Sequence, residues 1–363
     1  MSNRIQLNTT VSNHHFIEVG FEINNKIIEY LRSTFSCKKG VLIIDENVFE
    51  LYKESFVSKI KAVFDEQITC IVPSGESSKC LDQFHKITGK LLNFGVERGT
   101  PVVVVGGGVT GDLGGFVASS CLRGMPLIHI PTTLLAMVDS SIGGKTGINH
   151  DVGKNLIGAF YQPEAVFVDL LFLETLSKRE LINGLGEVIK YGMIRDKTIF
   201  DALKELSLTE KFSYSKTWEQ IVETCARIKV EIVSEDFKES GVREILNFGH
   251  TFAHVIERVG SYKEYAHGEA VFMGMWGAVK LSGLLGFNID IANLSTFKPL
   301  YTSKFDSDKS PEELTALMQY DKKIKDGAIK VIILEELEKA KSTVITNTTV
   351  IEESWKFIIQ EFK

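Results

Sequence analysis

Residues 101–112 read Pro-Val-Val-Val-Val-Gly-Gly-Gly-Val-Thr-Gly-Asp, and this stretch decides the fold. The unbroken run of four valines is typical of a strand that is buried on both faces of a parallel sheet. Gly106, Gly108 and Gly111 then follow the spacing G-x-G-x-x-G, and an apolar helix is predicted to come next. Glycines in such a turn let backbone amides approach a pyrophosphate, and the helix N-terminus adds partial positive charge. The stretch therefore predicts a phosphate- or dinucleotide-binding α/β fold.

The glycine-rich loop departs in one respect from the fingerprint of an ordinary dehydrogenase. No acidic residue ends a predicted strand about 20 residues downstream, where that fingerprint places the ribose ligand. The candidate for a hydrogen bond to the adenosine ribose is instead Asp45, which lies upstream and follows the short β-branched run 41–44. We therefore expect the strand order, or the pose of the nucleotide, to differ from that of a dehydrogenase.

The pattern of apolar residues divides the chain into two parts. In the first part strands alternate with helical segments such as 77–93, and the strands are predicted at 41–44, 68–72, 101–105, 127–130 and 166–168. The second part is helical, with helices near 217–235, 246–259 and 268–285, capping boxes at 177–180 and 310–313, and an edge hairpin pairing 330–334 with 343–345. This pattern predicts a Rossmann-like, mainly parallel sheet in an N-terminal α/β domain, 1–170, and a mainly α-helical C-terminal domain, 171–363.

The bulk composition limits the class of protein. The 363 residues are 44% hydrophobic and 24% charged, so a sizeable core is expected. A formal net charge of -6 argues against a nucleic-acid scaffold, and no apolar run approaches the roughly 20 residues of a membrane helix. The N-terminus lacks the apolar segment of a signal peptide, and the five cysteines form no C-x-x-C pair. These features predict a cytoplasmic protein without a disulfide framework, with neither nucleic acid nor membrane as partner.

Two further loops favour an anionic ligand. Thr132 and Thr133 follow a predicted strand, where their hydroxyls could meet phosphate or nicotinamide. Downstream, Lys145 and Lys154 stand in backbone loosened by glycines and framed by Asp and Asn side chains. The Gly-Gly-Lys-Thr stretch at 143–146 resembles the end of an ATP-binding P-loop, but the first glycine of that motif is absent. The two lysines therefore favour an anionic small molecule over ATP.

A separate group of residues predicts a divalent metal site. His250 and His254 are four residues apart on one face of a predicted helix, and His267 follows in the sequence His-Gly-Glu-Ala. Upstream, Glu187 and Lys190 share one face of another helix because they are three residues apart. One carboxylate and two imidazoles with an open position is a common zinc arrangement for catalysis. The spacing leaves open which two histidines would bind the metal, and the lack of H-E-x-x-H argues against a zinc protease.

The motifs of this chain resemble those of the 3-dehydroquinate synthase family along essentially the whole length. In the first half they are Pro73-Ser-Gly-Glu-x-x-Lys79, Gly106-Gly-Gly-Val-x-Gly-Asp112, Arg123-Gly, Pro131-Thr-Thr-Leu-Leu, Asp139-Ser-Ser-x-Gly-Gly-Lys145-Thr and Gly153-Lys-Asn-x-Ile-Gly-Ala-Phe-Tyr-Gln-Pro163. In the second half they are Glu187-Val-Ile-Lys190-Tyr-Gly, Asn247-x-Gly-His250-Thr-x-x-His254, His267-Gly-Glu-Ala-Val and Asp321-Lys-Lys323. The resemblance implies a nucleotide-binding α/β domain, a mostly helical C-terminal domain and, commonly, a homodimer.

The resemblance also implies a role for each candidate residue. The divalent metal, Zn2+ or Co2+, would be bound by Glu187, His250 and His267, which leaves His254 to the substrate. NAD would be held by Asp45, Asn47, Glu76, Lys79, Gly106, Gly107, Gly108, Asp112, Thr132, Thr133, Asp139 and Ser140, with Lys145 and Lys154 beside it. The carboxylate, hydroxyls and phosphate of the substrate would be held by Lys145, Asn155, Lys190, Lys229, Arg243, Asn247 and one of Lys322 or Lys323. Arg123 resembles the arginine that family members offer to the phosphate in the partner subunit's site.

The family's reaction converts 3-deoxy-D-arabino-heptulosonate 7-phosphate into 3-dehydroquinate and phosphate, in the shikimate pathway of aromatic amino acid biosynthesis. It proceeds through transient oxidation by NAD, phosphate elimination, reduction, ring opening and aldol cyclisation, so NAD is not consumed. Metal coordination of the substrate hydroxyls and ketone favours these steps, and Lys and Arg donors suit an anionic substrate and a developing enolate.

Three alternative functions share some of these sequence features. Sibling sugar-phosphate cyclases, such as 2-epi-5-epi-valiolone synthase or 2-deoxy-scyllo-inosose synthase, share fold, NAD and metal. Lys229, Arg243, Asn247 and His254 here follow the dehydroquinate synthase pattern, which suits a substrate with a carboxylate. A metal-dependent polyol dehydrogenase of the glycerol dehydrogenase type would instead release NADH in stoichiometric amounts. A nucleotide-binding regulator with a dead site is disfavoured, because every expected ligand residue is present.

Overall fold

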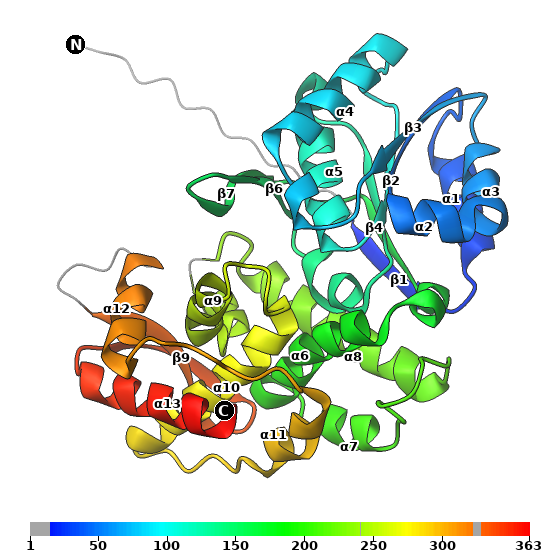
Figure 1. The fold of residues 1–363 in the computed structure, drawn as a ribbon. Coiled ribbons are helices and arrows are strands. Elements are labelled where there is room, and N and C mark those ends of the chain that lie inside the picture. Colours follow the sequence, from blue (N-terminus) through cyan, green and yellow to red (C-terminus); the bar gives the residue numbers. More distant parts are fainter. Residues whose placement is uncertain (1–14, 240, 322–327) are drawn as a thin grey trace, which may run out of the picture.

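The protein consists of an α/β half and a helical half, which lie one above the other in Figure 1. The computed structural model describes residues 15–239, 241–321 and 328–363. The α/β half is built on a six-stranded parallel sheet with the order β1-β8-β5-β4-β2-β3. These strands are β1 (Phe16–Gly20), β2 (Lys39–Asp45), β3 (Glu66–Val72), β4 (Val102–Gly106), β5 (Leu127–Pro131) and β8 (Ala165–Asp169). The predicted Rossmann-like α/β fold is confirmed.

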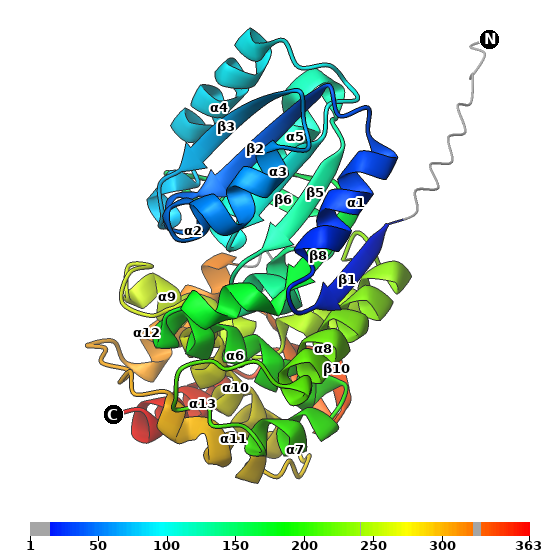
Figure 2. The ribbon, with the colours of Figure 1, turned by 90° about the vertical axis from the view of Figure 1, so that its right-hand side faces the viewer.

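Helices cover both faces of the sheet, which explains why its central strands are apolar throughout. Along β2, Val41 and Ile43 join the core on one face, whereas Leu42 and Ile44 join the core on the other. The first face is covered by α4 (Leu81–Phe94) and α5 (Gly108–Ser120), and the second by α1 (Asn24–Thr34), α2 (Glu46–Tyr52) and α3 (Ser58–Lys61) (Figure 2).

α5 lies very close to the sheet because glycines occupy the positions that face it. A Cβ atom at Gly114 would lie 2.7 Å from Cγ1 of Val104, and one at Gly115 would lie 2.5 Å from Cγ2 of Thr146. Neither distance leaves room for a methyl group, so glycine at 114 allows α5 to approach β4, and glycine at 115 allows it to approach the separate strand segment 145–150 that carries Thr146.

α10 (His267–Leu284) forms the centre of the helical half. Nearly all of its residues are buried, and it packs against α6, α9, α13 and β9. A helix that is apolar on all sides is expected in such a central position. The elements around it are α6 (Lys178–Ile194), α7 (Thr198–Lys204), α8 (Lys216–Glu235), α9 (His250–Val259), α11 (Ala292–Phe297), α12 (Pro311–Asp321), α13 (Thr348–Glu361) and the hairpin of β9 (Ile329–Glu336) and β10 (Lys339–Ile345).

The structure differs from the sequence predictions at several element boundaries. The hairpin near 330–345 forms a separate two-stranded sheet instead of an edge of the main sheet. The predicted helix 246–259 begins only at His250, because a 3-10 turn occupies 242–247 and Gly249 has a φ of +80°. Two features were not predicted: strand β1, and a hairpin of β6 (Lys145–His150) and β7 (Gly153–Phe160). Both are partly exposed or rich in glycine, so neither has a strong apolar pattern.

The two predicted capping boxes differ in completeness. At α12, Ser310 Oγ accepts the Glu313 N–H, and the Glu313 carboxylate accepts the Ser310 N–H. At α6, Ser177 Oγ accepts the Glu180 N–H, but the Glu180 carboxylate accepts a hydrogen bond from Asn183. The first box is therefore complete and the second is half formed.

Two further findings concern the whole described chain. All five cysteines are free thiols, as their spacing predicted. Within residues 15–239, 241–321 and 328–363, no helix combines the length and the apolar character that a bilayer crossing requires.

Candidate functional site

The candidate site lies where the carboxyl ends of the central strands face the helical half (Figure 2). The loop after β4 begins with Gly106, the loop after β5 with Thr132, and β2 ends at Asp45. Because parallel strands end at the same edge of a sheet, residues that are distant in the chain meet there.

The glycine-rich loop packs directly against the loop that follows β5. The Thr132 N–H donates a hydrogen bond of 3.0 Å to the Gly106 carbonyl. A Cβ atom at Gly107 would lie 2.9 Å from Thr133 Cγ2, and one at Gly108 would lie 3.0 Å from Ser140 Oγ. Side chains at 107 and 108 would therefore fill the space in front of the α5 N-terminus.

Ser140 supplies an independent indication of a ligand. Its hydroxyl is buried, and no residue that the structure describes forms a hydrogen bond with it. A buried hydroxyl without a partner is costly unless a ligand or water satisfies it. The open α5 N-terminus and this hydroxyl together fit an anionic cofactor group such as a phosphate.

Asp45 lies beside this loop because β2 is the neighbour of β4 in the sheet. Its carboxylate caps α2 by accepting the N–H groups of Asn47 and Val48, and it also accepts a hydrogen bond from Ser74 Oγ. The acidic residue therefore precedes the glycine loop in the chain but still follows an adjacent strand. Acid and loop thus lie at the ends of neighbouring strands, although their order along the chain is the reverse of that in the dehydrogenase fingerprint.

A second set of predicted cofactor residues gathers beside the β6–β7 hairpin. The Lys79 ammonium contacts both the Asp112 carboxylate and the Asn155 side-chain oxygen. Glu76 accepts a 2.6 Å hydrogen bond from Asn149 in the same hairpin. Burial raises the pKa of Asp112, and the charge of Lys79 partly offsets that rise. The hairpin therefore brings Asn155 to the cofactor loop.

Glu187, His250 and His267 form a compact group from α6, α9 and α10, and their candidate ligand atoms lie within 4.8 Å of one another. Nε2 of His250 is 3.5 Å from Glu187 Oε1, and Nε2 of His267 is 3.4 Å from the same oxygen. Both carboxylate oxygens of Glu187 are buried and accept no hydrogen bond of regular geometry from the described residues, although the Lys190 ammonium lies against one of them. This donor set fits a divalent metal such as zinc.

The other nitrogen of each imidazole has its own partner. Nδ1 of His250 lies 3.3 Å from the Phe248 carbonyl, and Nδ1 of His267 lies 3.3 Å from Glu257 Oε1. Both Nε2 atoms are therefore directed at Glu187, as expected for metal-ligating histidines. His254 is half-buried, and its ring centroid lies 5.8 Å from that of His250, outside the group of three.

The charges of this group shift several pKa values. Burial opposes ionisation of Glu187, but Lys190 and the histidines outweigh it and lower its pKa to about 2. Burial lowers the pKa of His250 to about 3. For His267, burial is outweighed by the neighbouring carboxylates of Glu187 and Glu257, which raise its pKa to about 10.

Two buried lysines connect the metal group to the cofactor loops. Lys229 on α8 donates to both the backbone carbonyl and the carboxylate of Asp139, at 2.5 and 2.7 Å. The Tyr191 hydroxyl, next to Lys190 on α6, lies 3.1 Å from the same carboxylate. Burial opposes the charge of Asp139, but Lys229 and Lys190 hold its pKa well below the usual range. Tyr191 was not predicted as a site residue, although it directly follows Lys190 in the sequence.

Arg243, Lys145 and Asn247 meet around a loop that the sequence did not single out. The buried Arg243 guanidinium donates to the carbonyls of Phe237 and Gly143. The Glu239 carboxylate pairs with the Lys145 ammonium and accepts a 2.7 Å hydrogen bond from Asn247. Glu239 stands in none of the sequence motifs described above, so only its tertiary contacts identify it as a site residue.

The remaining predicted residues lie at the margins of this arrangement or beyond it. The Lys154 ammonium lies 4.6 Å from the ring centre of Tyr262, in the loop between α9 and α10. Arg123 is exposed in the turn after α5, at the opposite end from Gly108, about 20 Å away along a helix of this length. Lys322 and Lys323 lie outside the described residues.

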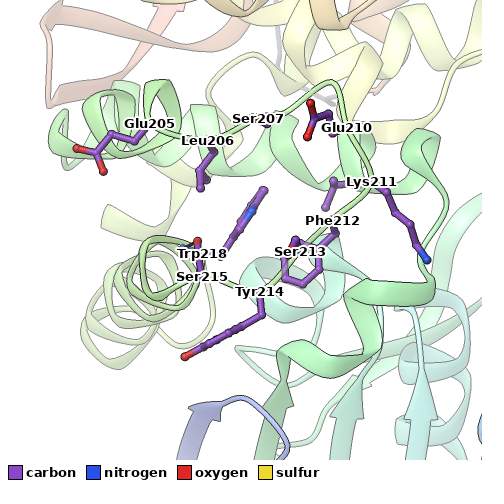
Figure 3. A pocket seen from close by; sticks show the side chains of 11 residues that line it. Glu205, Leu206, Ser207, Glu210, Lys211, Phe212, Ser213, Tyr214, Ser215 and Trp218 are labelled. Carbon is purple, nitrogen blue, oxygen red and sulfur yellow. Dashed lines mark hydrogen bonds between the residues drawn. The ribbon is translucent and has the colours of Figure 1, made fainter.

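A cavity of about 230 Å³ in the helical half is not the candidate site. It lies beneath the loop that joins α7 to α8, and Figure 3 shows Leu206, Phe212 and Trp218 directed into it. None of the predicted metal, cofactor or substrate residues lines this cavity. The chemistry-bearing side chains gather instead at the strand ends.

Comparison with known proteins identifies the family of the chain. The family model of the 3-dehydroquinate synthase N-terminal part matches residues 69–183, and that of the C-terminal part matches residues 184–324. A 3-dehydroquinate synthase of Desulforamulus reducens is 39% identical over 330 residues, which span 88% of this chain and 90% of that protein. A second, of Nitrosospira multiformis, is 41% identical over 319 residues, or 86% of each chain.

A solved structure of an NAD- and metal-bound enzyme matches the chain over nearly its whole length. The 2-epi-5-epi-valiolone synthase of Streptomyces hygroscopicus subsp. jinggangensis, with NAD+ and Zn2+ bound, is 25% identical with a TM-score of 0.87, over 98% of this chain and 99% of its own. Both family models match consecutive parts of the chain, and the curated relatives cover most of its length. The chain therefore belongs to the 3-dehydroquinate synthase family.

Proposed function

We propose that this chain converts 3-deoxy-D-arabino-heptulosonate 7-phosphate into 3-dehydroquinate and phosphate. The observation that carries the proposal is the arrangement in which α6 joins the metal group to the glycine-rich loop: Glu187 and Lys190 belong to the metal group, the adjacent Tyr191 hydroxyl contacts Asp139, and Ser140 packs against Gly108. Such a site brings together a place for a metal, cationic donors for an anionic substrate and a place for a dinucleotide.

The cofactors of the proposed enzyme are NAD and one divalent metal ion, Zn2+ or Co2+. The valiolone synthase of similar structure has NAD+ and Zn2+ bound, and a 2-deoxy-scyllo-inosose synthase has NAD+ and Co2+. When bound, NAD supplies transient oxidation of a secondary alcohol, and the metal supplies positive charge near the developing enolate. The residues that would hold NAD are Asp45, Asn47, Glu76, Lys79, Gly106, Gly107, Gly108, Asp112, Thr132, Thr133, Asp139, Ser140, Lys145 and Lys154.

We assign substrate binding to the buried lysine and arginine side chains and to the residues beside them. Lys190 and Lys229 are held next to the metal group by Glu187 and Asp139, so their ammonium groups can bind hydroxyl or enolate oxygens without being repositioned. Glu239 holds Lys145 and Asn247 side by side, where a carboxylate or phosphate can accept from both. The proposed substrate residues are Lys145, Asn155, Lys190, Lys229, Arg243, Asn247, His254 and one of Lys322 or Lys323.

We further propose that the enzyme is a cytoplasmic homodimer with domains 1–170 and 171–363 and with no nucleic-acid or membrane partner. The turn that carries Arg123 supports the dimer, because Leu122 and Arg123 have positive φ angles of 50° and 65° and present an exposed guanidinium far from the chain's own site. The β6–β7 hairpin exposes Val152 and Leu156, which are 82% and 63% accessible, as a partner-facing surface would.

A phosphate-release assay tests the proposed activity. With catalytic amounts of NAD and with Zn2+ or Co2+, the purified protein is expected to release phosphate from the heptulosonate 7-phosphate without accumulating NADH. The His250→Ala variant serves as the control that lacks a metal ligand. Net NADH formation would instead identify a polyol dehydrogenase, and phosphate release only from a sugar 7-phosphate without a carboxylate would identify a sibling cyclase.

Subunit complementation tests the role of Arg123. The Arg123→Ala variant is expected to lose activity by about 30-fold or more, because a charge-assisted contact to the phosphate is removed. Mixing it with inactive His250→Ala should restore about a quarter of wild-type activity, since half of the random dimers would contain one intact site. An inactive mixture, despite demonstrated subunit exchange, would show that Arg123 does not act across the interface.

A further inference from the structure

We propose that Glu257 is a positioning residue for the metal site, and that its carboxylate fixes the tautomer and the orientation of His267. This inference rests on the proposed function, because it takes Glu187, His250 and His267 as the metal ligands.

The two nitrogens of the His267 ring face different carboxylates. Nε2 lies 3.4 Å from Glu187 Oε1, whereas Nδ1 lies 3.3 Å from Glu257 Oε1. An acceptor at Nδ1 retains the proton there and leaves the Nε2 lone pair directed at the metal position. Glu257 therefore stands behind the ring, where it can act on the metal only through His267.

Glu257 is buried beside the His267 ring, 3.3 Å from its Nδ1. The residue is only 7% exposed. A buried carboxylate is a strong acceptor for an imidazole N–H and raises the basicity of the opposite nitrogen.

The position of Glu257 follows from the helix that carries it. His250, His254 and Glu257 lie at i, i+4 and i+7 of one stretch, so all three share a face of α9. The Glu257 carbonyl also accepts a 2.7 Å hydrogen bond from the Tyr262 N–H, which anchors the end of α9 through the backbone. Changing the side chain therefore leaves this anchor in place.

The two metal-ligating histidines are oriented by different means. Nδ1 of His250 faces the backbone carbonyl of Phe248, which no substitution removes. Nδ1 of His267 faces a side chain. A change at position 257 is therefore expected to alter metal affinity through the His267 imidazole and not through that of His250.

Zn2+ affinity measured by competition with a chromophoric chelator tests this inference. Glu257→Gln, which keeps the shape but loses the charge, is expected to bind Zn2+ about tenfold more weakly, and Glu257→Ala up to about 100-fold more weakly. The visible absorption of bound Co2+ should shift in both variants, and the rise in the unfolding temperature on adding metal should shrink. If Glu257→Ala does not fold, Glu257→Gln carries the test.

Glu219→Gln is the matched control, because it removes a carboxylate on α8 that pairs with Lys216 and Tyr214. Its metal affinity and Co2+ spectrum are expected to equal those of the wild type. Wild-type affinity and spectrum in both Glu257 variants would overturn the inference while leaving the proposed function intact. A wild-type protein that binds neither ion would overturn both.

Discussion

The Glu187→Gln variant is expected to lose metal-dependent phosphate release by about 10³-fold or more. The substitution replaces the charged member of the group formed with His250 and His267, which we propose as metal ligands, by a neutral amide. Metal polarisation of the substrate is worth several kcal/mol, and about 4 kcal/mol corresponds to a factor of about 10³ in rate. Initial rates with saturating NAD and Zn2+ provide the measurement.

The same substitution is expected to destabilise the metal-free protein by about 3 kcal/mol, because the Lys190 ammonium would remain buried without its counter-charge. Both side chains of this pair are almost fully buried, at 1% and 0% exposure. The double variant Glu187→Gln/Lys190→Met should recover most of the free energy of unfolding, measured in denaturant with a chelator present, but none of the activity. Retention of metal-dependent turnover by the single variant would show that Glu187 is not a ligand.

The Gly268→Ala variant is expected to lose about 3 kcal/mol of stability, together with tight metal binding. A Cβ atom at this position would lie 1.7 Å from the backbone carbonyl oxygen of Asn183, and one at the facing Gly186 would lie 2.4 Å from the Gly268 carbonyl oxygen. Overpacking at a helix contact without flexible neighbours forces the backbones apart. Glu187 and His267 directly adjoin the two glycines, so separating α6 from α10 also separates these two proposed ligands.

Gly283→Ala provides a matched control on the same helix. No atom lies within 4 Å of a Cβ built at Gly283, so this substitution should stabilise the helix by about 0.5–1 kcal/mol. Denaturant unfolding and chelator competition on both variants give the comparison. Equal stability and metal affinity in the two would contradict a role for the glycine contact in spacing the ligands.

The fold could be predicted because its central strands have apolar patterns that only a buried parallel sheet explains. The valines of β4 and the β-branched run of β2 were recognised on this basis, and the structure confirms both strands. The edge strand β1 and the β6–β7 hairpin could not be found in this way, since contacts outside their own segments stabilise them. Isolated propensity is weak in such segments.

The candidate site could be anticipated only for residues that stand in motifs. Helical spacing predicted that Glu187 and Lys190 share one helix face and that His250 and His254 share another. It did not decide which two of the three histidines would bind the metal. Tyr191, Glu239 and Glu257 went unrecognised, because each acts through a partner on another element. Such contacts depend on how α6, α9 and α10 pack, which local spacing does not encode.

The glycines of α5 also bear on how the protein folds. Gly108, Gly111, Gly114 and Gly115 make up four of its 13 residues, and together they disfavour the helix by about 3–4 kcal/mol relative to alanine. The segment therefore has little tendency to become helical before its neighbours are in place. Packing against Val104 and Thr146 stabilises it as a helix, so we expect the start of the cofactor loop to take shape only once β4 and the β6–β7 hairpin are in place.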